Sequence, residues 1–206
     1  MNRQTMNYMR KMLGWLCLAI TPASVIFSFL GNNAADTWHS ISATYYATDC
    51  AIMIGLLVTT AVFFASYRGY NLADRIITDI SAVSALGVVV FPCWSIAAPE
   101  RTGLLQLERG LSHTIHCASA MILFASFFVM IFFQFTKTSG RMTEAKRIRN
   151  KIYRICGIVI AAGMLSQVVT SVLGIGWMTI VNEGFMLTAF SIAWLVKGEQ
   201  VKTLRD

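Results

Sequence analysis

Charge is scarce in this sequence: 13% of its 206 residues are Asp, Glu, Lys or Arg, whereas 56% are hydrophobic. An ordinary soluble domain has roughly 25% charged residues. Here the charges gather in short clusters between long apolar runs. A bilayer core about 30 Å thick requires about 20 apolar residues for each helical span. The sequence therefore excludes an ordinary soluble fold and predicts an integral membrane protein.

The motifs of several other protein classes are missing. The five cysteines, an odd number, lie within or beside apolar runs, which does not predict a disulfide framework. The net charge of +7 is not accompanied by zinc-finger spacing, a Walker-type glycine loop or interleaved aromatic and basic residues. We therefore expect no nucleic-acid partner.

Six apolar runs are long enough to be transmembrane helices. They cover residues 12–31, 46–67, 76–98, 111–135, 152–174 and 177–196. A backbone inside lipid must satisfy its own hydrogen bonds, which favours helices, and Pro22 and Pro92 are expected to kink theirs. The predicted fold class is all-α: a polytopic membrane protein in which residues 1–206 form one six-transmembrane-helix bundle.

The distribution of basic residues predicts the orientation of this bundle. Fifteen of the 17 Lys and Arg residues lie in the N-terminal segment, the second and fourth loops and the C-terminal tail, whereas the alternate loops contain only Arg101 and Arg109. By the positive-inside rule, the fifteen face the cytoplasm. We therefore expect both termini in the cytoplasm of a bacterial inner membrane.

Several features at the edges of the spans have structural explanations. Asp79 follows Arg75 by four residues, so the two can pair on one helix face. The basic stretch 137–154 can extend the fifth helix and touch anionic lipid headgroups, or it can serve only to set the topology. Gln167 belongs to a polar face that suits contact between helices. The phenylalanines of the fourth span are expected to face lipid: Phe127, Phe128, Phe132 and Phe133.

The polar residues of the opposite, outer side are the candidate functional groups. Glu183 lies inside the sixth span and Asp49 inside the second, with no Lys or Arg within the spans to neutralise them. An acid at the centre of a span costs about 2.5–3.5 kcal/mol, so ionisable groups there are functional candidates. The others are His113 and His116 on the fourth span and His39, Ser42 and Asp36 in the first outer loop. We expect these groups to form a polar pocket.

Three interpretations of this pocket stay open. His113 and His116 share a helix face and, with His39 as third ligand, have the make-up of a zinc site. Asp49 or Glu183 would then be a fourth ligand or the general base for a bound water. Alternatively the groups form a proton-exchanging cluster without metal, or the histidines act independently at the interface.

Short segments spread from Ser40 onward carry a resemblance to a known group of proteins. These segments are SISATYY at 40–46, YRGY at 67–70, ALG at 85–87, Ile115-His116, and Glu183 followed by AFSIAWLVKG at 189–198. Their order and spacing resemble a group of small six-helix bacterial inner-membrane proteins of unknown function. The resemblance implies that Glu183 and His116 are the marked polar positions. Where that pattern often has Arg-Asp in the second helix, this chain has Cys50-Ala51.

A more distant similarity is to the ceramidase and adiponectin-receptor superfamily of intramembrane metal hydrolases. That superfamily combines three histidines, a serine and an aspartate across helices, and His39, His113, His116, Ser42 and Asp49 supply the same set. The analogy implies a metal-dependent hydrolase that acts on a lipid or another amphiphile.

The sequence thus leaves three functions open. The chain is a metal-dependent lipid hydrolase, a transporter, channel or membrane-perturbing effector that uses Glu183 and Asp49, or a non-catalytic membrane subunit or sensor. The expected partners are membrane lipids and either a second copy of the chain or another membrane subunit.

Overall fold

A computed structural model describes residues 3–30, 39–47, 50–69, 71–96, 98–138, 140 and 142–204. The α-helices of this part are α1 (Arg3–Leu30), α2 (Cys50–Ser66), α3 (Leu72–Val90), α4 (Arg109–Val129), α5 (Glu144–Val172) and α6 (Met178–Lys197). Shorter elements are the 3-10 turns η2 (Ser42–Tyr46) and η4 (Lys202–Leu204), the π-helical turn η3 (Met130–Gln134), and the strands β1 (Arg101–Thr102) and β2 (Leu107–Glu108). The all-α fold class is confirmed.

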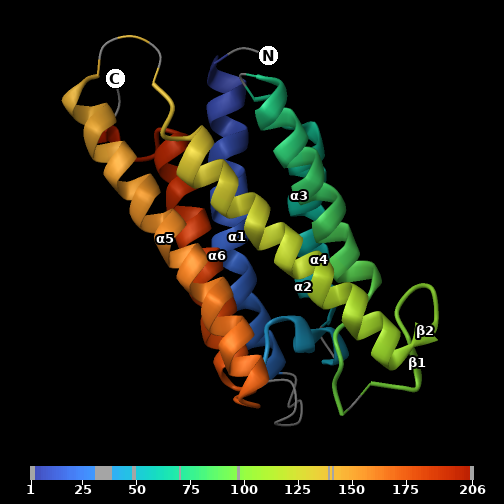
Figure 1. The fold of residues 1–206 in the computed structure, drawn as a ribbon. Coiled ribbons are helices and arrows are strands. Elements are labelled where there is room, and N and C mark those ends of the chain that lie inside the picture. Colours follow the sequence, from blue (N-terminus) through green and yellow to red (C-terminus); the bar gives the residue numbers. More distant parts are fainter. Residues whose placement is uncertain are drawn as a thin grey trace.

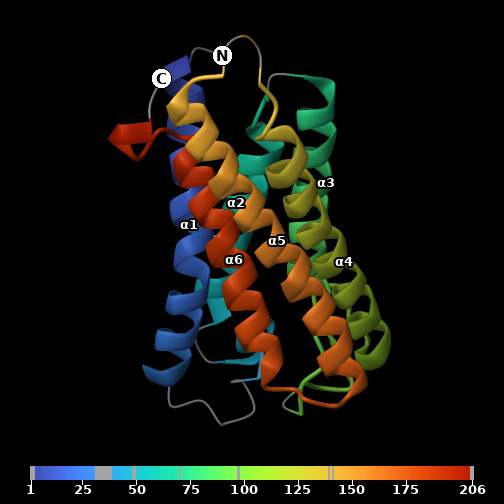
Figure 2. The ribbon, with the colours of Figure 1, turned by 60° about the vertical axis from the view of Figure 1, so that its left-hand side comes forward.

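The helices run up and down along a common axis and form a closed ring (Figures 1 and 2). Each helix packs against the next in the chain, and α6 packs against α1. Gly14 allows this last contact, because a Cβ there would lie 3.1 Å from the backbone nitrogen of Leu195. Both chain ends lie at one end of the bundle, here called the terminal end (Figure 1). The opposite, distal end holds η2, the β1–β2 hairpin and the α5–α6 turn.

In the described part of the chain, four helices are long and apolar enough to cross a membrane: 4–28, 109–134, 144–172 and 178–197. Helix α2 is equally apolar but has 17 residues, and α3 carries three charged residues near its start, Asp74, Arg75 and Asp79. Large apolar side chains cover the outside of the bundle, including Val83 (71% exposed) and Leu165 (67%). Such a surface suits lipid rather than water. The four apolar helices and this apolar surface therefore suit a membrane protein.

Two predicted spans are longer than the corresponding helices. The third helix ends at Val90 and does not continue to residue 98. Pro92 therefore terminates this helix rather than kinking it, because proline lacks an N–H and disfavours helical geometry in the residue before it. The second helix begins at Cys50, and residues 42–46 form the separate turn η2.

Two further helices begin before their predicted spans, α1 at Arg3 and α5 at Glu144. The basic stretch does extend the fifth helix, which begins at Glu144 after the Thr143 side chain accepts a hydrogen bond from the Lys146 N–H. The helix α4 has a similar cap, because the Glu108 carboxylate accepts bonds from the N–H groups of Gly110 and Leu111. These bonds lower the pKa of Glu108. The cap therefore stabilises α4 at neutral pH and is lost when the pH falls through that lowered pKa.

Three phenylalanines from alternate helices fill the axis of the ring. Phe64 of α2, Phe127 of α4 and Phe190 of α6 are each no more than 1% exposed. The rings of Phe127 and Phe190 stack with centroids 3.8 Å apart, and Phe64 lies 5.6 and 5.8 Å from them. The expectation that Phe127 faces lipid is therefore wrong. It holds for Phe133, which is 51% exposed.

Polar side chains join neighbouring helices where the packing is tight. The hydroxyls of Ser81 and Ser126 are 2.7 Å apart between α3 and α4. Between α5 and α6, the Gln167 amide donates to Thr179 (3.0 Å) and accepts from Asn182 (3.1 Å). Such bonds stabilise helix association in membranes. The interpretation of Gln167 as a contact between helices is confirmed.

We expect Phe127→Ala to lower the free energy of unfolding by about 3 kcal/mol, because it leaves a cavity in the packed axis. Phe133→Ala is the matched control, since it truncates the same side chain on the same helix at an exposed position. Thermal unfolding of both purified variants in one detergent measures the difference. Equal losses would show that the axial layer does not hold the bundle together.

Candidate functional site

Glu183 is the centre of the polar contacts at the distal end. It lies on α6, half-buried, and its carboxylate accepts hydrogen bonds from the residues that follow α1. The Ser40 hydroxyl donates to its two oxygens at 2.9 and 3.1 Å, and the Ile41 backbone N–H donates at 2.6 Å. The Ser42 hydroxyl lies 3.4 Å away. Three successive residues thus converge on one carboxylate.

The segment 39–46, which supplies these donors, is shaped to present them. The Ser42 N–H donates to the Ser40 hydroxyl (3.0 Å), which leaves that hydroxyl's own proton for the carboxylate. The His39 carbonyl accepts from the Ile180 N–H at the start of α6 (3.0 Å). Ile41 and Ala43 are buried and hold the turn η2 against the bundle. The segment 39–46 therefore closes the distal end by binding α6 at two places.

This arrangement stabilises a charge within an apolar helix by hydrogen bonding. Bonds to an ionised acceptor are roughly twice as strong as neutral ones. In the part of the chain that the structure describes, no Lys or Arg pairs with Glu183, so the donors of the segment 39–46 take that role. A proton added to the carboxylate would remove the charge and weaken every bond that holds the segment. The site can thus convert protonation into release of a loop.

His116 has a different set of partners. It is 5% exposed, and its Nδ1 lies 2.8 Å from the Phe91 carbonyl and 3.2 Å from the Val88 carbonyl. Carbonyl oxygens only accept, so Nδ1 carries the proton. The Val88 carbonyl would bond the N–H of residue 92 in a continuous helix, but that residue is Pro92. His116 therefore caps the broken end of α3.

His113 and Cys117 face the same region from α4. The Trp94 N–H donates to His113 Nδ1 at 3.0 Å, so a neutral His113 carries its proton on Nε2. The Cys117 sulfur lies 3.6 Å from Nε2. Among the described residues, neither side chain has a hydrogen bond to the Glu183 carboxylate.

The predicted site residues are thus only partly brought together. The Ser42 hydroxyl lies within hydrogen-bond distance of the Glu183 carboxylate, and the His39 carbonyl accepts a hydrogen bond from the Ile180 N–H on the same helix as Glu183. No hydrogen bond or ion pair among the described residues links His116 with Glu183.

The predicted zinc site gains no support from this geometry. Within the described ranges, no three His, Cys, Asp or Glu side chains form a group that could hold a metal ion. Asp36 and Asp49 lie outside those ranges, so their roles stay predictions.

A second polar cluster, at the terminal end, was not expected from the sequence. Arg10 is 3% exposed, and its guanidinium donates to the Tyr67 hydroxyl at 3.0 and 3.1 Å and to Asn7 at 2.9 Å. Arg10 and Tyr67 are 57 residues apart, so no local pattern could pair them. The sequence predicts Arg10 only as one of the basic residues of the N-terminal segment. In the structure its side chain is buried inside the ring of helices.

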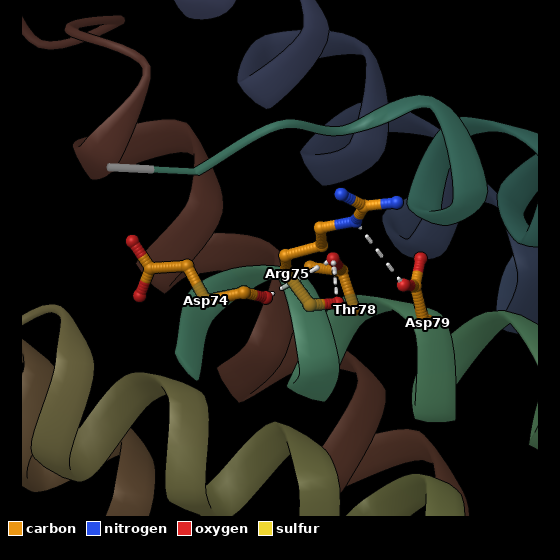
Figure 3. A network of polar contacts seen from close by, with 4 residues as sticks. All are labelled: Asp74, Arg75, Thr78 and Asp79. Atoms are coloured by element: carbon orange, nitrogen blue, oxygen red, sulfur yellow. Dashed lines mark hydrogen bonds and ion pairs between the residues drawn. The ribbon is translucent and has the colours of Figure 1, made fainter. Parts of the chain in front are cut away.

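The start of α3 contributes to the same end of the bundle (Figure 3). The predicted pair of Arg75 and Asp79 is confirmed, with 3.7 Å between Nε and the carboxylate. The Thr78 hydroxyl donates to the carbonyls of Asp74 and Arg75. The Asp74 carboxylate points away from the Arg75–Asp79 pair (Figure 3) and lines a small cavity with Lys197 of α6.

No protein-family model, curated protein or solved structure matches this chain. The resemblance to six-helix bacterial membrane proteins therefore stays a prediction. Function has to be argued from the geometry of the two ends.

We expect Glu183→Ala to release the segment 39–46, because it removes the acceptor of all three donors. A hydrogen bond to a charged group contributes about 1.5–3 kcal/mol, so the Ile41 amide should exchange at least about tenfold faster. Hydrogen exchange read by mass spectrometry over residues 39–46 measures this. Glu100→Ala, in an exposed loop at the same end, should leave the exchange unchanged; equal protection in both variants would contradict the role of Glu183.

Proposed function

We propose that the protein spans a bacterial inner membrane six times, with the terminal end in the cytoplasm. Four helices meet the length and hydropathy needed to cross, and α2 and α3 lie beside them in the same ring. The charges of α3 lie in its first two turns, at the terminal end. The segments that carry fifteen of the 17 basic residues also belong to that end, which suits the positive-inside rule.

Reporter insertions test this topology. Alkaline phosphatase inserted at Gln106, in the distal hairpin, should be active, because that end is expected outside the cytoplasm. The same enzyme inserted at Thr138, in the α4–α5 connection, should be inactive, while a fluorescent protein there should fold and fluoresce. Phosphatase activity at Thr138 would reverse the proposed orientation.

We further propose that Glu183 is a reversible proton site and that the protein is a proton-coupled transporter or channel. The convergence of Ser40, Ile41 and Ser42 on one carboxylate carries this proposal. With the carboxylate charged, the segment 39–46 holds the distal end closed. A proton from the outer side weakens those bonds and frees the segment to move. His113 and Cys117 of α4 are further titratable groups at the distal end, 3.6 Å apart.

The order of residues along α6 supports a gated passage. Glu183 lies near the distal end, Phe190 in the axial aromatic layer, and Lys197 at the terminal end. The phenylalanine layer fills the axis between the two polar ends, so conduction requires the layer to move. A closed distal loop above an apolar constriction matches the way in which channels and transporters block leakage.

The alternative of a zinc-dependent hydrolase uses the same end of the molecule. It requires three histidines around one ion. In the structure, His113 Nδ1 accepts from the Trp94 N–H, and His116 Nδ1 donates to the Phe91 carbonyl, so each Nδ1 is already bonded to a backbone group. The proton site uses contacts that are all present among the described residues. The proton-coupled function therefore rests on more of the observed geometry.

We expect Glu183→Gln to reduce proton flux in proteoliposomes by at least about tenfold, because glutamine keeps the shape of the side chain but cannot bind a proton. Flux is followed with an internal pH-sensitive dye under an imposed pH gradient. Glu100→Gln serves as the control and should keep wild-type flux. Equal flux in both variants, or no flux by the wild type under any gradient, would sink the proposal.

A further inference from the structure

Two buried hydroxyl groups of α1, those of Thr21 and Ser24, have no hydrogen-bond partner in the described part of the chain. The Ser24 side chain is almost fully buried, at 3% exposed. On other helices, buried hydroxyls donate to the carbonyl four residues earlier, as those of Thr60, Thr170 and Ser191 do. A buried hydroxyl without a partner is costly, and buried water usually satisfies such groups. The two hydroxyls of α1 therefore indicate a polar ligand inside the bundle.

These hydroxyls lie at the level of Glu183. A Cβ at Gly184 would lie 3.5 Å from Thr21 Cγ2, so Thr21 faces the residue that follows Glu183 on α6. Helices α1 and α6 run in opposite directions (Figure 2). Ser24 follows Thr21 by three residues, which is about 4.5 Å of helix towards the distal end. Glu183 therefore lies between the levels of the two hydroxyls.

Gly184 leaves space between α1 and α6 at this level. Outside its own turn of helix, a Cβ there would meet one described atom within 4 Å, Thr21 Cγ2, at an ordinary contact distance. At Gly14 and Gly163, a Cβ would lie 2.7 and 2.6 Å from the side chains of Leu195 and Met186. Close packing explains those two glycines but not Gly184. We infer that Gly184 keeps a gap open beside the acid.

We propose that the hydroxyls of Thr21 and Ser24 and the gap at Gly184 form a water-binding site next to Glu183. Each hydroxyl can donate and accept, so two hydroxyls and the carboxylate give a water molecule about three polar partners, as buried waters usually have. The Glu183 carboxyl gives its proton to the water oxygen, and the water releases one of its own protons towards the interior of the bundle. The inference rests on the proposed proton site and adds its inner partner.

Radiolytic labelling tests for the water without measuring flux. X-rays convert water in place into hydroxyl radicals, which oxidise the side chains beside it, and mass spectrometry locates the oxidised residues. Cys17 is 1% exposed and lies one turn before Thr21 on α1, so its sulfur should be oxidised much faster than that of Cys156, which is 5% exposed on α5. Equal rates at the two cysteines would overturn the water site.

Removing both hydroxyls should remove the water. Thr21→Val combined with Ser24→Ala should lower the oxidation of Cys17 to the level of Cys156. Thr21→Ser keeps both hydroxyls and should keep the oxidation of Cys17. Oxidation of Cys17 that persists unchanged in the double variant would overturn the assignment of the water to these hydroxyls.

Gly184→Ala tests whether this water belongs to the proton route. The added methyl fills the gap without a clash, so the unfolding temperature should not fall, whereas proton flux in proteoliposomes should fall at least about fivefold, because proton transfer through water needs that water in place. Gly55→Ala on α2 is the matched control and should keep wild-type flux, since a Cβ there would meet no described atom within 4 Å. Wild-type flux in Gly184→Ala would overturn the role of the water in proton transfer.

The hydroxyl variants give a second measure of the same route. Thr21→Val with Ser24→Ala should lose proton flux to a similar extent as Gly184→Ala. The matched control is Thr170→Val with Ser191→Ala, which removes two buried hydroxyls that are bonded within their own helices and should keep the flux.

The outcomes separate this inference from the proposed function. If Glu183→Gln loses proton flux while the Thr21 and Ser24 double variant keeps it, the proton function stands and the inner water is wrong. If the wild type carries no flux, the proton function and the part of the water in it both fail, and the oxidation of Cys17 still decides whether the water site exists.

Discussion

A carboxylate on an apolar helix needs hydrogen-bond donors, and the structure of the distal end follows from where the donors of Glu183 lie. Glu183 takes them from the segment 39–46, through the Ser40 hydroxyl and the Ile41 N–H. An uncompensated acid deep in a span costs about 2.5–3.5 kcal/mol. Because the donors belong to the connection after α1, satisfying the charge also attaches that connection to α6. The bonds that stabilise the Glu183 carboxylate therefore also close the distal end of the bundle. A change in the charge of Glu183 would weaken these bonds.

His116 shows that an ionisable group in a span can have a structural purpose. Pro92 cannot bond the Val88 carbonyl, and the His116 ring does so in its place, while the Ser112 hydroxyl donates to the Pro92 carbonyl. Each group compensates a backbone atom that hydrocarbon would otherwise leave unsatisfied. Glu183 differs, because its donors come from the connection after α1 and not from a packed helix. His116 is bonded to the end of a packed helix, so its contacts fix α3 against α4.

The two ends of the bundle are chemically separate. At the distal end the Glu183 carboxylate accepts from neutral donors, whereas at the terminal end Arg10 donates to Tyr67, and Lys146 and Lys197 both contact Phe135. Between them, the rings of alternate helices fill the axis. The aromatic layer therefore separates the polar contacts of the two ends.

The sequence by itself determined the all-α class, the approximate positions of the helices, and the Arg75–Asp79 pair, because hydropathy and i,i+4 spacing are local properties of the chain. It also indicated Glu183 and Ser42 as site residues. Only the tertiary structure decided that Phe127 faces the axis, that His116 bonds α3 rather than Glu183, and that Arg10 lies beside Tyr67. These outcomes depend on which faces meet when the helices close into a ring. Contacts between residues far apart in the chain determine which faces meet, and the local pattern of apolar residues does not contain this information.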